Sequence, residues 1–84
     1  MAVSEASTEF GARLEYAIRD RKLTFSKVAN KSGISRASLS HYIYGERIPN
    51  ADAMMRIAKC LYLTPDELYR IMEALYDDLD DYPD

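Results

Sequence analysis

The chain has 84 residues, of which 48 % are hydrophobic and 30 % charged; this suits one small folded domain and excludes global disorder. It has no run of about 18 apolar residues, so we expect no membrane span. Its first residues lack the basic and apolar stretches of a signal peptide. The single cysteine, Cys60, cannot form an internal disulfide, and we expect it to pack in the core of a cytoplasmic protein.

The net charge of −3 is unevenly distributed along the chain. Residues 19–47 contain seven basic and two acidic residues, a balance of +5. Residues 1–18 contain one basic and three acidic residues (−2), and residues 48–84 contain three basic and nine acidic residues (−6). Because phosphates respond to the local field rather than to the charge of the whole chain, residues 19–47 are a candidate nucleic-acid-binding segment.

The first predicted element is a helix over about residues 8–21, preceded by a flexible start over residues 1–7. Its apolar side chains follow helical spacing on one face: Phe10, Leu14, Ala17 and Ile18. We interpret this helix as scaffold. Arg21 and Lys22 lie just before residues 24–45, and we expect them to reach a DNA backbone.

Residues 24–45 predict two short helices that meet at a glycine. Thr24 can cap the first helix, and Gly33 stands where a helix needs a left-handed residue to end. Ser35 can cap the second helix, and Ala29 is small enough to let the two helix backbones approach each other. Two capped helices so close in sequence must cross steeply, which predicts a helix-turn-helix.

The second of these helices has two distinct faces. Its apolar residues fall on one side and its polar and small residues on the other: Leu39, Tyr42 and Ile43 inward, and Ala37, His41 and Tyr44 outward, with Arg36, Ser38 and Ser40 at the edges. Small, hydrogen-bonding and basic groups suit base edges and phosphates. An ordinary solvated face would carry more Glu and Lys.

Two further helices are predicted downstream. Asn50 can cap a helix whose buried stripe is Met54, Ile57, Ala58 and Leu61. Thr64, Pro65 and Glu67 then form a capping box with proline at the first helical position. The apolar stripe of this last helix runs through Ile71 and Leu75 towards Leu79 and Tyr82, which is longer than a small core needs.

No arrangement of residues in the sequence indicates catalysis or metal binding. His41 is the only histidine and has no nearby cysteine or carboxylate cluster, and no serine has a base arranged beside it. The aspartates of residues 77–84 lack the glycine-centred loop of a calcium site and indicate a solvated acidic tail. We therefore expect no enzyme activity, no metal and no cofactor.

Three separated stretches resemble the lambda-repressor/Cro-like (XRE) helix-turn-helix family: LTFSKVANKSG (23–33), GISRASLSHYIYGERIPN (33–50) and MRIAKCLYLTPDEL (55–68). The resemblance covers roughly residues 10–75. It implies an all-α, compact five-helix domain over residues 8–76, with the helix-turn-helix formed by helices two and three. Two residues depart from the pattern: Phe25 replaces a glutamine that contacts a phosphate, and Ile43 replaces a common glutamate.

The resemblance also implies which residues contact duplex DNA. Base edges are assigned to Arg36, Ala37, Ser38 and His41. The DNA backbone is assigned to Thr24, Ser26, Lys27, Ser40, Tyr44 and Arg47, with Lys22 added for its place beside the motif. Because Phe25 cannot donate a hydrogen bond, the backbone N–H groups that open its helix and the Ser26 hydroxyl would hold the phosphate.

Proteins of this family bind operator half-sites as dimers, which implies a homodimeric repressor of phage or accessory type that occludes a promoter. We place the dimer interface on the unassigned apolar surface of Ile71, Leu75, Tyr76 and Leu79. A monomer in which this stripe completes the core is the alternative. A different class of function is also open: an antitoxin-like protein-interaction module that binds a partner through the last helix and the acidic tail.

Overall fold

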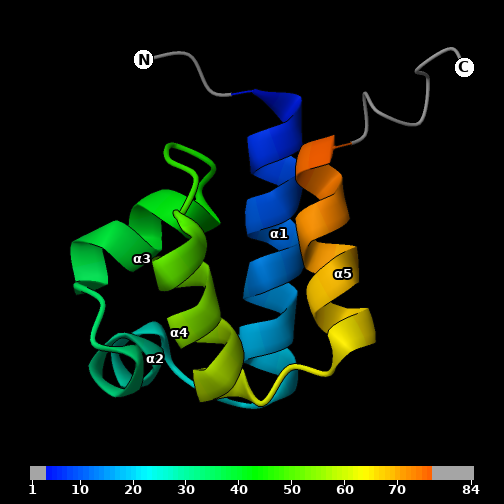
Figure 1. Ribbon diagram of the computed structural model, residues 1–84. Helices are drawn as coiled ribbons and strands as arrows, with labels where there is room; N and C mark the ends of the chain where they lie inside the picture. Colours follow the sequence, from blue (N-terminus) through cyan, green and yellow to red (C-terminus); the bar gives the residue numbers. More distant parts are fainter. Residues whose placement is uncertain (1–3, 77–84) are drawn as a thin grey trace, which may run out of the picture.

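The computed structural model describes residues 4–76, which fold into five α-helices joined by short connecting segments (Figure 1). They are α1 (Glu5–Asp20), α2 (Phe25–Ser32), α3 (Arg36–Ile43), α4 (Ala51–Leu61) and α5 (Pro65–Glu73). No strand occurs within these residues. The expectation of an all-α, five-helix domain is confirmed. The described part also contains no helix that is long and apolar enough to cross a membrane.

Helix α1 begins three residues earlier than the sequence pattern predicted. Ser4 is its N-cap, and the Ser4 hydroxyl accepts a hydrogen bond from the Ser7 backbone N–H at 3.0 Å. The Thr8 hydroxyl donates to the Ser4 carbonyl, so Thr8 lies within the first turns rather than before them. The cap was missed because the apolar spacing, which fixed the predicted start, begins only at Phe10.

Helix α1 packs against α3 and α5, while α2 packs against both α3 and α4 (Figure 1). The side chains that lose essentially all exposure come from all of the first four helices: Phe10, Leu14, Ile18, Val28, Leu39, Ile57 and Leu61. Burial of this kind contributes about 25 cal/mol per Å² of apolar surface and is the main stabilising contribution in a small domain. The core therefore holds α3 in place mainly through its contacts with α1 and α2.

Gly11 allows the close crossing of α1 and α3. A Cβ atom added to Gly11 would lie 2.0 Å from the Ile43 carbonyl oxygen and 2.8 Å from that of Tyr42. The end of α3 thus rests directly on the backbone of α1. Nothing in the local sequence indicated this contact, because Gly11 lies inside a helical pattern.

The predicted capping box at the start of α5 is confirmed. The Thr64 N–H donates to Glu67 Oε1 at 2.9 Å, and the Glu67 N–H donates to the Thr64 hydroxyl at 3.1 Å. On the same helix Ile71 is only 4 % exposed and belongs to the core. This corrects the prediction that Ile71 contributes surface to a dimer interface, because its side chain is already covered. Leu79 and the aspartates of the predicted tail lie outside the described residues.

Candidate nucleic-acid interface

Helices α2 and α3 form a helix-turn-helix whose turn has the predicted chemistry. Gly33 has φ 75°, and the N–H groups of Gly33 and Ile34 both donate to the Ala29 carbonyl, at 3.0 Å and 3.2 Å. Thr24 caps α2 and Ser35 caps α3, each accepting a backbone N–H. Ala29 is buried at the junction. Because Gly33 is left-handed and Ser35 caps the next helix, α2 ends and α3 begins within three residues.

The two faces of α3 separate as predicted. Leu39, Tyr42 and Ile43 are buried in the core. Ile43, where the family pattern commonly has glutamate, is 3 % exposed and is therefore a packing residue. Ala37 and Tyr44 are exposed on the opposite side. The outer side of α3 is thus available for contact with another molecule.

All eleven candidate DNA-contacting side chains are at least partly accessible. Those that are fully exposed are Lys22, Thr24, Ser26, Lys27, Arg36, Ala37, Tyr44 and Arg47, and those that are half-buried are Ser38, Ser40 and His41. They come from α2, from α3 and from the short segments that flank them. The two helices thus bring the candidates together on the helix-turn-helix. None of them is lost to the core.

Arg36 at the start of α3 makes two contacts within the protein. Its Nη1 donates to the Ser40 hydroxyl one turn further along the helix. Its guanidinium carbon lies 5.0 Å from the centre of the Phe25 ring in α2. The Arg36 side chain is therefore oriented although it is exposed.

His41 is paired with a carboxylate that the sequence reading did not include in the site. His41 Nδ1 lies 2.8 Å from Glu46 Oε1. The backbone brings the two together, because the Glu46 N–H donates to the His41 carbonyl at 2.8 Å in the turn that follows α3. The spacing of five residues is not a helical pairing distance, so only the turn geometry could have revealed this contact.

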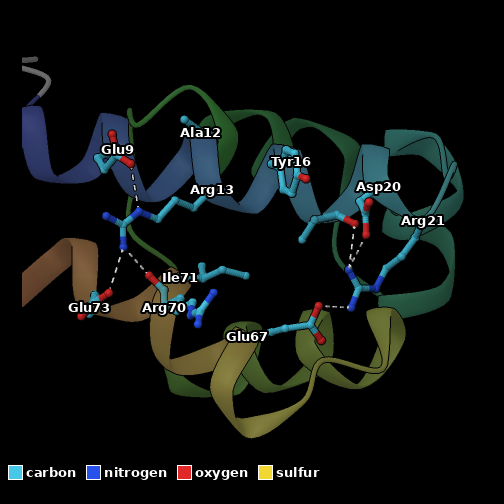
Figure 2. A pocket seen from close by; sticks show the side chains of 11 residues that line it. Glu9, Ala12, Arg13, Tyr16, Asp20, Arg21, Glu67, Arg70, Ile71 and Glu73 are labelled. Carbon is cyan, nitrogen blue, oxygen red and sulfur yellow. Dashed lines mark hydrogen bonds and ion pairs between the residues drawn. The ribbon is translucent and has the colours of Figure 1, made fainter.

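Arg21, which was expected to reach a DNA backbone, makes its contacts within the protein. Its Nε donates to the Leu61 carbonyl and its Nη2 to Glu67 Oε2, both at 2.7 Å, while Nη1 donates to Ala17 O at 3.2 Å (Figure 2). Arg21 therefore links the end of α1 to the end of α4 and the start of α5. Its charge is compensated there.

Glu67 receives this arginine and also the cap of its own helix. The hydrogen bond from the Thr64 backbone lowers the pKa of the Glu67 carboxyl, and the hydrogen bond and charge of Arg21 lower it further. Figure 2 shows Glu67 and Arg21 at one end of the groove between α1 and α5. At the other end Arg13 bridges Glu9 in α1 to Glu73 and the Arg70 carbonyl in α5. The charged residues of this groove hold the scaffold together.

The described residues contain no group of histidine, cysteine and acidic side chains that could hold a metal ion. Cys60 is half-buried, and its Sγ lies 3.8 Å from the Val28 carbonyl oxygen. Burial raises the pKa of the Cys60 thiol, and the nearby charge of Lys31 offsets part of that rise. Cys60 is thus a packing residue between α4 and α2 rather than an activated thiol.

Comparison with known proteins identifies the family. A helix-turn-helix family model matches residues 14–68. The chain belongs to this XRE-type helix-turn-helix family. The fold is similar to that of the restriction-modification controller protein C.AhdI from Aeromonas hydrophila, with a TM-score of 0.68 and 26 % identity over 73 % of this chain and 92 % of the controller. The comparison with curated proteins gave no match.

The resemblance inferred from sequence is therefore confirmed. The family and the similar controller support a DNA-binding transcriptional regulator. The predicted DNA contacts lie mainly on the outer face of α3 and at the start of α2.

Proposed function

We propose that the protein is a homodimeric, sequence-specific repressor that occludes a promoter by covering an operator. The observation that carries the proposal is the composition of the exposed side of α3. It presents Arg36, Ala37, Ser38 and His41 with no acidic residue inside the helix itself. Arginine can donate two hydrogen bonds to guanine, serine accepts or donates to either base type, and an alanine methyl can contact a thymine methyl.

The DNA backbone would be held around this helix rather than by it alone. Three exposed cations lie in or beside the helix-turn-helix: Lys22 before α2, Lys27 in its first turn and Arg47 after α3. Ser40 and Tyr44 extend the contact along α3. Phosphate contacts of this kind set affinity and its dependence on salt, whereas base contacts set specificity.

The start of α2 supplies the remaining phosphate contact. The Thr24 hydroxyl caps the helix by accepting a hydrogen bond from the Lys27 backbone N–H at 3.1 Å, and its own O–H can still donate to a phosphate. The first backbone N–H groups of α2 and the exposed Ser26 hydroxyl would donate to the same phosphate. A helix N-terminus favours an anion through its orphan N–H groups and its dipole.

Helix α5 offers the apolar surface for a dimer. Leu68, Met72 and Leu75 are half-buried against the core and follow helical spacing, so they form one stripe. Tyr76, which is 53 % exposed, and Tyr69, which is 67 % exposed, continue this stripe towards solvent. The proposed interface therefore keeps Leu75 and Tyr76, adds Leu68, Met72 and Tyr69, and omits Ile71.

The controller protein that resembles this chain is described as acting in restriction-modification. A controller role is consistent with the present proposal and does not decide between repression and activation. Occlusion is proposed because a dimer bound across a promoter would exclude polymerase from it.

Selection of binding sites from a random duplex library tests the proposal. The intact protein should enrich one short sequence present as two half-sites, and its binding should weaken as salt rises. Enrichment of a single half-site would contradict the dimer. A protein that retards no duplex at any salt concentration would instead be a protein-interaction module.

A further inference from the structure

Phe25 occupies an unusual place among the charges of the helix-turn-helix. It is the first residue of α2, and its half-buried side chain packs against the core. Two guanidinium groups approach its ring: that of Arg36 in α3 at 5.0 Å and that of Arg19 in α1 at 5.6 Å from the ring centre. Both distances lie within the range of about 6 Å at which a guanidinium is attracted to an aromatic face.

Arg36 is held at a second point by the Ser40 hydroxyl. An exposed arginine normally loses rotamer freedom when it binds, which weakens the interaction that it makes. An arginine that is already held by a ring and a hydroxyl loses less of that freedom. The ring contact uses no N–H donor, and only one of the five guanidinium N–H groups donates to Ser40, so donors remain for a base.

We infer that Phe25 is a positioning residue that orients Arg36 for paired hydrogen bonds to one guanine. The phenyl ring cannot donate a hydrogen bond to a phosphate, but it presents an aromatic face to the Arg36 guanidinium. Phe25 therefore raises specificity at one base pair without touching DNA.

The inference rests on the proposed function, and a double-mutant cycle tests it separately. Dissociation constants are measured at one salt concentration for the wild type, Phe25→Leu, Arg36→Ala and the double variant. Each protein is tested on the selected duplex and on a random duplex, and the preference is the ratio of the two constants. Phe25→Leu should reduce the preference about two- to fivefold, the size expected for a cation–π contact at an exposed site.

In the Arg36→Ala background the same substitution at position 25 should leave the preference unchanged, because the group that the ring orients is absent. Equal losses in both backgrounds, or no loss in either, would overturn the inference. A wild-type protein with no preference for any duplex would overturn the proposed function itself. The two failures are therefore distinguishable.

Two controls separate orientation from folding. Phe25→Tyr keeps the ring and should keep the wild-type preference, whereas a loss as large as that of Phe25→Leu would overturn the inference. Arg19→Ala removes the other cation near the ring and should leave the preference unchanged, whereas a loss as large as that of Phe25→Leu would overturn the inference. Thermal melts identify any variant that does not fold; Phe25→Met, which fills similar space without a ring, then replaces Phe25→Leu.

Discussion

His41 in α3 and Glu46 in the turn that follows form a contact beside the candidate DNA-binding surface. The Glu46 carboxylate lies 2.8 Å from His41 Nδ1, so it can hold the imidazole ring in one orientation. It also places a negative charge beside the surface that is proposed to approach phosphates.

Glu46→Gln removes this charge and keeps a polar group beside His41, so affinity for the selected duplex should rise several-fold at fixed pH and ionic strength. Fluorescence anisotropy with a labelled duplex measures the change. Asp66→Asn, which removes an acid from α5, serves as the control for net charge. An affinity that does not change in Glu46→Gln would contradict a place for this carboxylate beside the bound phosphates.

Glu67 couples the stability of the fold to acid. Its pKa is lowered in the folded protein, first by the Thr64 backbone hydrogen bond and then by Arg21, so the ionised form stabilises the folded state. This contribution is complete above the ordinary value of 4.5 and is lost as the pH falls through the lower folded-state value.

Glu67→Gln should therefore be less stable than the wild type near neutral pH, and the difference should disappear in acid. Urea unfolding at a series of pH values measures it. Asp66→Asn removes the other acid from the first turn of α5, and its effect on stability measures how much of the Glu67 effect comes from the helix dipole. A difference that persists unchanged into strong acid would contradict the role of the ionised carboxyl.

Helix α1 determines where α3 lies. The backbone of α1 at Gly11 contacts the last carbonyls of α3, and Gly45 just beyond α3 approaches the Thr8 backbone, 2.9 Å from where its own Cβ would lie. Both contacts are backbone to backbone, so neither neighbour can move by rotating a side chain. The scaffold helix thus positions α3 by direct contact.

Gly11→Ala should destabilise the protein, although alanine is favoured over glycine in a helix by about 1 kcal/mol. The added methyl group must displace α3, and overpacking of this kind costs about 1–3 kcal/mol or more. Because the added Cβ would lie 2.0 Å from a backbone oxygen, we expect the cost to exceed the propensity gain and Tm to fall by several degrees. Ala12→Gly, on the exposed side of α1, measures the propensity effect alone, and a Gly11→Ala variant that melts higher than the wild type would contradict the contact.

The elements whose ends depend on local chemistry could be predicted from sequence. Thr24, Ser35, Asn50 and Thr64 all cap the helices to which they were assigned, because a cap bonds to a backbone N–H only three residues away. The inward face of α3 was predictable for the same reason, since helical spacing fixes which side chains share a side.

Contacts between distant residues could not be predicted in this way. Arg21 was expected near DNA because it lies just before the helix-turn-helix, but Glu67 and the Leu61 carbonyl approach it only after the chain has folded. Ile71 was assigned to an interface because its stripe looked too long, and the packing of α5 on α1 covers it. Proximity in sequence carries no information about either contact.

The whole molecule places the helix-turn-helix and α5 on different sides of α1 (Figure 1). A dimer formed through α5 therefore leaves α3 of both protomers uncovered. Two such helices must be about 34–36 Å apart to enter successive major grooves, and a two-fold axis sets that distance.

Sedimentation of variants tests the α5 interface. The intact protein should be a dimer at tens of micromolar, and Tyr76→Glu and Leu75→Glu should shift it towards monomer, because each would bring a charge into an apolar contact. Tyr16→Glu changes an exposed tyrosine of α1 and serves as the control. An intact protein that is already monomeric, or variants that stay dimeric, would contradict this interface.

We propose that α3 distinguishes base sequences while the residues around it hold the DNA backbone. A comparison of Arg36→Ala with Lys27→Ala tests this division. Both variants are measured on the selected and the random duplex over a range of salt. Arg36→Ala should cost about 1–3 kcal/mol on the selected duplex and little on the random one. Lys27→Ala should weaken binding to both alike and reduce the salt slope by about one. Equal losses on the two duplexes for Arg36→Ala would show that it only clamps a phosphate, and would contradict base recognition by α3.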